Sequence, residues 1–172
     1  MDYKPYAIAC NRDIDDVNLN KLKEIAEKLS NYGFTLRSFG SDVPGNTVEK
    51  ELIRVEYFLP FKKFNNRTGS KLAKPTDGSF EIAKRYHPAY EKLKESVRQI
   101  LASNVHMILG ENLKDPILFL LVYSPDGVEK GKDTTIRTGS VSFVIKVTDS
   151  INVPVINIKN SNTLDRLNQY LR

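Results

Sequence analysis

The segment from residue 116 to residue 124 reads PILFLLVYS and is the most continuously apolar stretch of the chain. An apolar run of this length, followed by the turn-forming residues of SPDG, predicts a strand that is buried on both faces. Such strands lie at the centre of parallel sheets whose two faces are covered by helices. The segment therefore indicates an α/β fold.

Strand and helix patterns alternate on both sides of this segment. The other predicted strands are residues 5–10, 34–40, 55–61 and 153–158, and the predicted helices are residues 18–33, 41–54, 87–103, 134–150 and 162–172. Residues 105–109, VHMIL, are apolar but fit either type. The alternation predicts a Rossmann-like three-layer fold with a mostly parallel central sheet, in a single domain over residues 1–172.

Composition excludes several classes of protein. The chain has 172 residues with a balance of apolar and charged residues that is typical of a soluble globular domain. No window approaches the roughly 20 apolar residues that a membrane helix needs, and the N-terminus lacks the pattern of a signal peptide. One cysteine, Cys10, cannot form an internal disulfide, so we expect a cytoplasmic location and no contact with a membrane.

The net charge of +5 is concentrated in one segment. Residues 60–98 contain ten lysines and arginines against four aspartates and glutamates. The resulting charge of +6 in this segment exceeds the net charge of +5 of the whole chain. The residues at about 61–84 are expected to form a long basic loop. Lys62, Lys63 and Arg67 are its candidate surface for a nucleic acid or a partner protein, with an ordinary solvated loop as the alternative.

Two loops at the predicted strand ends carry residues suited to an anion, because ligands of open α/β sheets bind beyond the carboxyl ends of the strands. One wall of the expected site comprises Arg37, Ser38, Gly40 and Ser41, and the other comprises Ser124, Asp126, Gly131, Thr134 and Thr135. Neither loop matches a nucleotide-binding fingerprint, since G-x-x-x-x-G-K-[ST] and G-x-G-x-x-G are both absent. No histidine or cysteine has metal-ligand spacing, so neither a metal nor a cofactor is expected.

The order of these motifs resembles the SLOG superfamily, Rossmann-like proteins encoded in many phage genomes and related to DprA and to the LOG proteins. The segments that carry the resemblance are YGFTLRSFGSDVPGNTVEKE (32–51), VEYFLPFKKFN (55–65), HPAY (87–90), NVHMILGENL (104–113), DPILFLLVYSPDG (115–127), GKDTTIR (131–137) and NVPVINI (152–158). The resemblance implies binding of a nucleotide or nucleotide-derived ligand at the strand ends. For a phage protein it also implies sensing or sequestration of that ligand in host defence, in the host cytoplasm.

The chain departs from this family where backbone would approach the ligand. Ser38-Phe39-Gly40-Ser41 stands where the family has Ser-Gly-Gly-Ala, and Gly131-Lys132-Asp133 stands where it has Gly-Gly-Thr. Glu49 matches an acidic position of the family, which makes it the candidate catalytic residue for cleavage of a nucleotide N-glycosidic bond. The lost glycines favour a binding protein over an enzyme of that kind.

Three functions therefore stay open. The first is binding of a nucleotide-like small molecule, the second is a DprA-like nucleic-acid or host-protein binding module that uses residues 60–98, and the third is a nucleoside N-glycosidase or deoxyribosyltransferase. The sequence leaves the ligand's identity and the oligomeric state open.

Overall fold

Five parallel strands form the central sheet of the protein in a computed structural model that describes residues 3–42 and 44–171. The strands are β1 (Lys4–Cys10), β2 (Phe34–Ser38), β3 (Val55–Tyr57), β4 (Leu120–Tyr123) and β5 (Val155–Asn157). Their order across the sheet is β3-β2-β1-β4-β5, and every pairing is parallel. The expected α/β class is confirmed.

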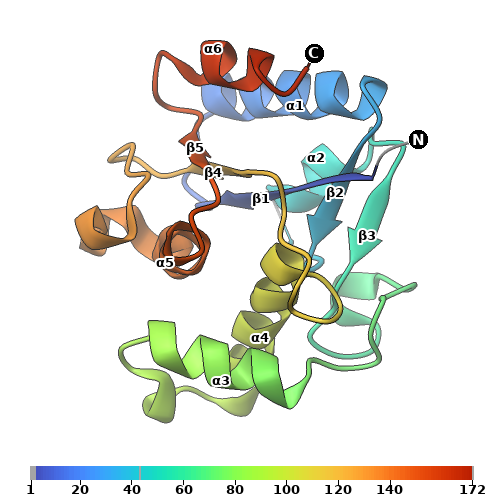
Figure 1. The fold of residues 1–172 in the computed structure, drawn as a ribbon, viewed down its shortest axis with the longest axis vertical. Coiled ribbons are helices and arrows are strands. Elements are labelled where there is room, and N and C mark those ends of the chain that lie inside the picture. Colours follow the sequence, from blue (N-terminus) through green and yellow to red (C-terminus); the bar gives the residue numbers. More distant parts are fainter. Residues whose placement is uncertain (1–2, 43, 172) are drawn as a thin grey trace.

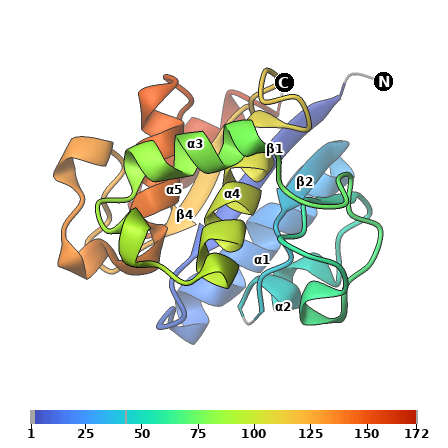
Figure 2. The ribbon, with the colours of Figure 1, turned by 90° about the horizontal axis from the view of Figure 1, so that it is seen from below.

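Helices cover both faces of this sheet (Figures 1 and 2). One face packs against α1 (Asp16–Asn31), α2 (Gly45–Glu49) and α6 (Thr163–Asn168), and the other packs against α4 (Glu95–Leu109) and α5 (Ser142–Ser150). Helix α3 (Asp77–Tyr86) packs on the outer side of α4. Short 3-10 helices η1 (Phe64–Asn66), η2 (Tyr90–Lys92), η3 (Gly131–Asp133) and η4 (Ile136–Val141) lie in the connections. The protein is thus a three-layer Rossmann-like fold.

The apolar segment that predicted the fold contains the central strand β4, which pairs with β1 on one side and β5 on the other. Successive side chains of a strand point to opposite faces of its sheet. Leu120 and Val122 accordingly lie in the core beneath α4 and α5, while Leu121 and Tyr123 lie in the core beneath α1 and α6. Burial on both faces explains why the segment is continuously apolar.

Two expectations for the middle of the chain were wrong. The basic loop expected at about 61–84 ends at Thr76, because α3 begins at Asp77. The helix expected at 87–103 begins only at Glu95 and continues through the undecided residues 105–109. The sequence did not predict α3, because Gly78 and the many charged residues mask the helical pattern of a short apolar face. That face includes the fully buried Ala83.

The direction of the crossovers changes between β1 and β4. From β1 the chain proceeds through α1 to β2 and β3, and then returns through α3 and α4 to β4 on the other side of β1. In open α/β sheets, this change of direction leaves a crevice at the carboxyl ends of the two strands. Among residues 3–42 and 44–171, no helix is both long and apolar enough to cross a membrane.

Candidate functional site

Carboxylates surround the N-terminus of the first helix, where a Rossmann-like fold commonly binds a phosphate group. Asp13, Asp15 and Asp16 lie between the end of β1 and the first turn of α1. The Asp15 carboxylate caps α1, because it accepts hydrogen bonds from the backbone N–H of Asn18 at 2.8 Å and from its amide at 2.7 Å. These bonds lower the pKa of Asp15. A negative charge already stabilises this helix end, so it repels an anionic ligand.

At the neighbouring end of β4, the Asp126 carboxylate binds hydroxyl groups of the protein itself. Its carboxylate accepts hydrogen bonds from the hydroxyls of Ser124 at 2.7 Å and Thr138 at 2.6 Å, with Thr135 at 3.4 Å. Burial alone would raise the pKa of Asp126, but the bonds from Thr138 and Ser124 outweigh it and lower the pKa. Ser124, Asp126 and Thr135 of the second expected wall therefore lie together, and they bind one another.

The remaining members of that wall face α5. The backbone N–H of Gly131 donates to the Asp149 carboxylate at 2.8 Å, and the Thr134 hydroxyl donates to the Gly131 carbonyl at 2.9 Å. A Cβ at position 131 would lie 3.2 Å from the Cα of Lys146. Gly131 therefore serves close packing on the helix.

In the first expected wall, Arg37 has a structural partner of its own. Its side chain is 2% exposed and donates to the backbone carbonyl of Asp115 at 2.6 Å and to its carboxylate at 2.7 Å. The guanidinium also donates to the Tyr3 hydroxyl at 3.0 Å. Arg37 thus ties β2 to the connection before β4, and its charge is not directed at the loop that follows β2.

Ser38 and Glu49 form a buried polar cluster at the ends of β2 and β3. The Ser38 hydroxyl donates to Oε1 of Glu49 at 2.5 Å, and the Tyr57 hydroxyl donates to Oε2 at 3.1 Å. Arg67 donates to the same Oε2 atom through Nε at 3.0 Å and Nη2 at 2.8 Å. Burial, followed by the charge of Glu49, raises the pKa of Tyr57. Both oxygens of the candidate catalytic carboxylate are therefore engaged.

Gly40 connects this cluster to the basic loop. Its φ angle is +79°, and a Cβ at this position would lie 2.6 Å from Leu59, so only glycine lets the loop come this close. Its carbonyl accepts hydrogen bonds from the side chains of Asn65 and Arg67, each at 2.9 Å. Ser41 lies at the start of α2, where a Cβ at position 45 would be 2.0 Å from its hydroxyl.

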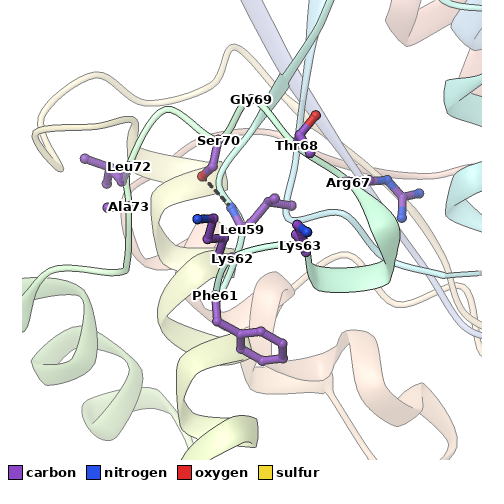
Figure 3. A pocket seen from close by; sticks show the side chains of 10 residues that line it. All are labelled: Leu59, Phe61, Lys62, Lys63, Arg67, Thr68, Gly69, Ser70, Leu72 and Ala73. Atoms are coloured by element: carbon purple, nitrogen blue, oxygen red, sulfur yellow. Dashed lines mark hydrogen bonds between the residues drawn. The ribbon is translucent and has the colours of Figure 1, made fainter.

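A cavity of about 410 Å³ opens within the basic loop (Figure 3). Its lining consists of Leu59, Phe61, Lys62, Lys63, Arg67, Thr68, Gly69, Ser70, Leu72 and Ala73. The Ser70 hydroxyl accepts a hydrogen bond from the backbone N–H of Leu59 at 3.0 Å and thereby joins the two sides of the loop. Apolar walls with a few polar groups, in a volume of roughly 300 to 1,000 Å³, are typical of small-molecule sites.

The charge of this cavity comes from two lysines. Lys62 and Lys63 are exposed and have no carboxylate partner among the described residues. Arg67 lines the cavity with its aliphatic stem, while its head group points away and is neutralised by Glu49 (Figure 3). No carboxylate belongs to the lining. The cavity combines an apolar surface with two uncompensated positive charges.

The three residues proposed from the sequence as a basic surface thus line a concave site, and no residue of either expected wall belongs to its lining. The apolar lining residues Leu59, Leu72 and Ala73 were not among the site residues predicted from the sequence. Leu59 lay in a predicted strand, and a leucine and an alanine between lysines in SKLAK look like an irregular solvated loop.

Other features bear on the site only indirectly. The structure joins no residue of one expected wall to the other by a hydrogen bond or ion pair within residues 3–42 and 44–171. In the same residues, no group of three or more histidines, cysteines, aspartates and glutamates is placed to hold a metal ion. Comparison of the chain with protein-family models, with curated proteins and with solved structures found no match.

Proposed function

We propose that the protein binds a nucleotide or nucleotide-derived anion in the cavity of the basic loop. The observation that carries this proposal is the pairing of an apolar lining with Lys62 and Lys63, which lack carboxylate partners among the residues that the structure describes. A phosphate group is attracted by two such ammonium groups, and the base and sugar have apolar surface on Leu59, Phe61 and Leu72 to cover. The cavity lies beyond β3, at the carboxyl edge of the sheet where ligands of this fold class bind.

The resemblance to SLOG proteins supports the same class of ligand. It adds the proposal that the protein comes from a phage and senses or sequesters a host nucleotide in defence. It also places the ligand close to the loop after β2, and in this chain Gly40 contacts the lining residues Leu59 and Arg67. The proposed ligand site is therefore displaced from the two walls toward the basic loop.

A binding role is favoured over N-glycosidic cleavage. A carboxylate that acts on a sugar must reach it within hydrogen-bond distance. Glu49 is 8% exposed, and Ser38, Tyr57 and Arg67 already donate to its two oxygens. It is also absent from the cavity lining.

Binding is tested by thermal shift and native mass spectrometry with a panel of ribonucleoside and deoxyribonucleoside mono-, di- and triphosphates and cyclic nucleotides. The double variant Lys62→Ala/Lys63→Ala is expected to weaken binding at least tenfold. Lys92→Ala/Lys94→Ala is the matched control, since it removes the same charge from exposed lysines outside the cavity. The proposal fails if no nucleotide binds, or if both double variants lose affinity equally.

A second candidate is binding of single-stranded nucleic acid along residues 60–98. The observation in its favour is that six cations of this segment have no carboxylate partner among the described residues: Lys62, Lys63, Lys74, Arg85, Lys92 and Lys94. Under this function, both double variants would weaken binding of a fluorescent oligonucleotide, and the affinity would fall steeply with salt. If only Lys62→Ala/Lys63→Ala weakens binding, and the affinity lost is that for a nucleotide, the result supports the nucleotide site and not the nucleic-acid surface.

A further inference from the structure

The two ends of the loop that forms the cavity meet on one buried histidine, His106 of α4, which is 1% exposed. At the first end, the Phe58 ring stacks on the imidazole with a centroid distance of 6.0 Å and an interplanar angle of 13°. At the other end, the backbone N–H of Thr76 donates to Nε2 at 3.2 Å, and the Thr76 hydroxyl lies 3.0 Å from the same nitrogen. Every residue of the cavity lining lies between Phe58 and Thr76.

These partners fix the protonation state of the ring. The Gly110 carbonyl lies 2.9 Å from Nδ1 and can only accept, so Nδ1 carries a proton. A backbone N–H can only donate, so the bond from Thr76 needs the free lone pair of Nε2. His106 is therefore neutral and holds the Nδ1–H tautomer.

We propose that His106 is a positioning residue of the cavity, whose neutral ring closes the base of the loop and whose protonation releases the Thr76 end. A proton on Nε2 would face the N–H of Thr76 and abolish that hydrogen bond. Thr76 also occupies the N-cap position of α3, so its release loosens the connection between the loop and the helix.

The surroundings of His106 oppose the charged form. Burial lowers the pKa of its imidazole, against the smaller opposing effects of the Gly110 carbonyl and the Glu111 charge. On the β2 side the Arg37 guanidinium lies 6.0 Å from the Phe58 ring and is bound to Asp115. That cation gives the ring no partner for a positive charge. Protonation therefore accompanies opening.

Opening of the loop is measured without any ligand by hydrogen–deuterium exchange of the amides in residues 59–76. An open loop restores the ordinary histidine pKa of about 6.5, so opening is favoured by up to about tenfold more at pH 5.5 than at pH 7.5. After correction for intrinsic exchange rates, we expect the loop amides to exchange several-fold faster at pH 5.5, up to about tenfold. The amides of β4 report global unfolding, which also exposes His106, so the loop amides must exchange faster than those of β4 at each pH if the loop opens on its own.

Two variants separate the hydrogen bond from the ring contact. His106→Gln keeps an acceptor for Thr76 but does not titrate near neutral pH, so its loop exchange should vary less than twofold between these pH values. His106→Phe keeps a ring against Phe58 but no acceptor, so its loop should exchange quickly already at pH 7.5. The proposal is overturned if the unmodified protein shows no acceleration, if the loop amides exchange no faster than those of β4, or if His106→Gln behaves like the unmodified protein.

We call the contacts of His106 with Phe58 and Thr76 the clasp. Its effect on ligand binding rests on the proposed function. At pH 7.5, His106→Phe should bind the best nucleotide of the panel more weakly than the unmodified protein, although it removes no group from the lining. If the exchange results hold and no nucleotide binds to any variant, the clasp stands and the proposed function fails. If nucleotide binding is unaffected in His106→Phe while its loop exchanges quickly, the positioning role is overturned.

Discussion

The two halves of the carboxyl edge of the sheet have opposite character. At the ends of β1 and β4, Asp15 caps α1 and Asp126 binds the hydroxyls around it, so carboxylates bound to the protein's own groups lie at the crevice expected from the topology. At the ends of β2 and β3, the loop after β3 encloses a cavity with two ammonium groups that pair with no carboxylate of residues 3–42 and 44–171. We call these regions the closed end and the open end.

The contrast shows that strand order defines where a site can form, while the loops determine where it does form. The change in crossover direction lies between β1 and β4, yet the cavity lies on the other side of β2. Charge explains the displacement, because a phosphate is repelled by the carboxylates of the closed end and attracted by the lysines of the open end. The variants below remove one contribution at a time.

The largest effect is expected from Glu49→Ala at the open end. Removing this carboxylate leaves the Arg67 guanidinium, whose side chain is 13% exposed, without its counter-charge. Breaking a buried ion pair from one side costs about 3 kcal/mol or more. Urea unfolding at pH 7 should show this loss in the free energy of unfolding, together with faster exchange of the loop amides.

Glu49→Gln is the control for the charge alone, because the amide oxygen can still accept from Arg67. We expect it to cost less than the alanine variant. A loss below about 1 kcal/mol in Glu49→Ala would mean that water solvates Arg67, and the cluster would then not anchor the loop.

A smaller loss is expected from Asp126→Asn at the closed end. The amide can accept fewer hydrogen bonds than the carboxylate, so the hydroxyls of Ser124 and Thr138 compete for one oxygen. One weakened charged hydrogen bond costs about 1 to 2 kcal/mol. Nucleotide affinity should be unchanged, since the cavity lies at the other end; a loss of affinity would refute the separation of the two ends.

The pH dependence of this variant has a definite sign. The pKa of Asp126 is lowered in the folded protein, so its carboxylate stabilises the fold fully above the unfolded pKa of about 3.9. That contribution disappears as the pH falls through the lower folded pKa. The difference in stability between the unmodified protein and Asp126→Asn should therefore shrink between about pH 5 and pH 2, as measured by urea unfolding at each pH.

The class of fold was largely predictable from the sequence, and the cavity at the open end was not. The apolar segment around β4 and the alternation of elements were sufficient for the class of fold, because burial on both faces leaves a continuous apolar run. Arg37 shows the limit of such reasoning. Its place after a strand favoured an anion, but its partner Asp115 is distant in sequence and becomes adjacent only through the pairing of the strands.

The candidate site illustrates the same limit. Lys62, Lys63 and Arg67 were identified by charge density alone, which cannot reveal that Glu49 neutralises Arg67 or that Gly40 lets Leu59 approach β2. His106 carried no metal-ligand spacing and so no functional signal. Its role depends on the ring's place between two residues that are 18 positions apart along the loop, which only the folded chain reveals.

The smallest expected effect concerns the backbone that presents Lys63 to the cavity. Its φ angle is +61°, a left-handed conformation that costs a non-glycine residue about 1 kcal/mol. Lys63→Gly should therefore raise the free energy of unfolding by up to about 1 kcal/mol relative to Lys63→Ala, which removes the same charge but keeps the strain. Equal stability in the two variants would show that the loop relaxes without strain. If glycine does stabilise the fold while both variants weaken nucleotide binding, the chain retains a less stable residue at the position where the cavity needs a cation.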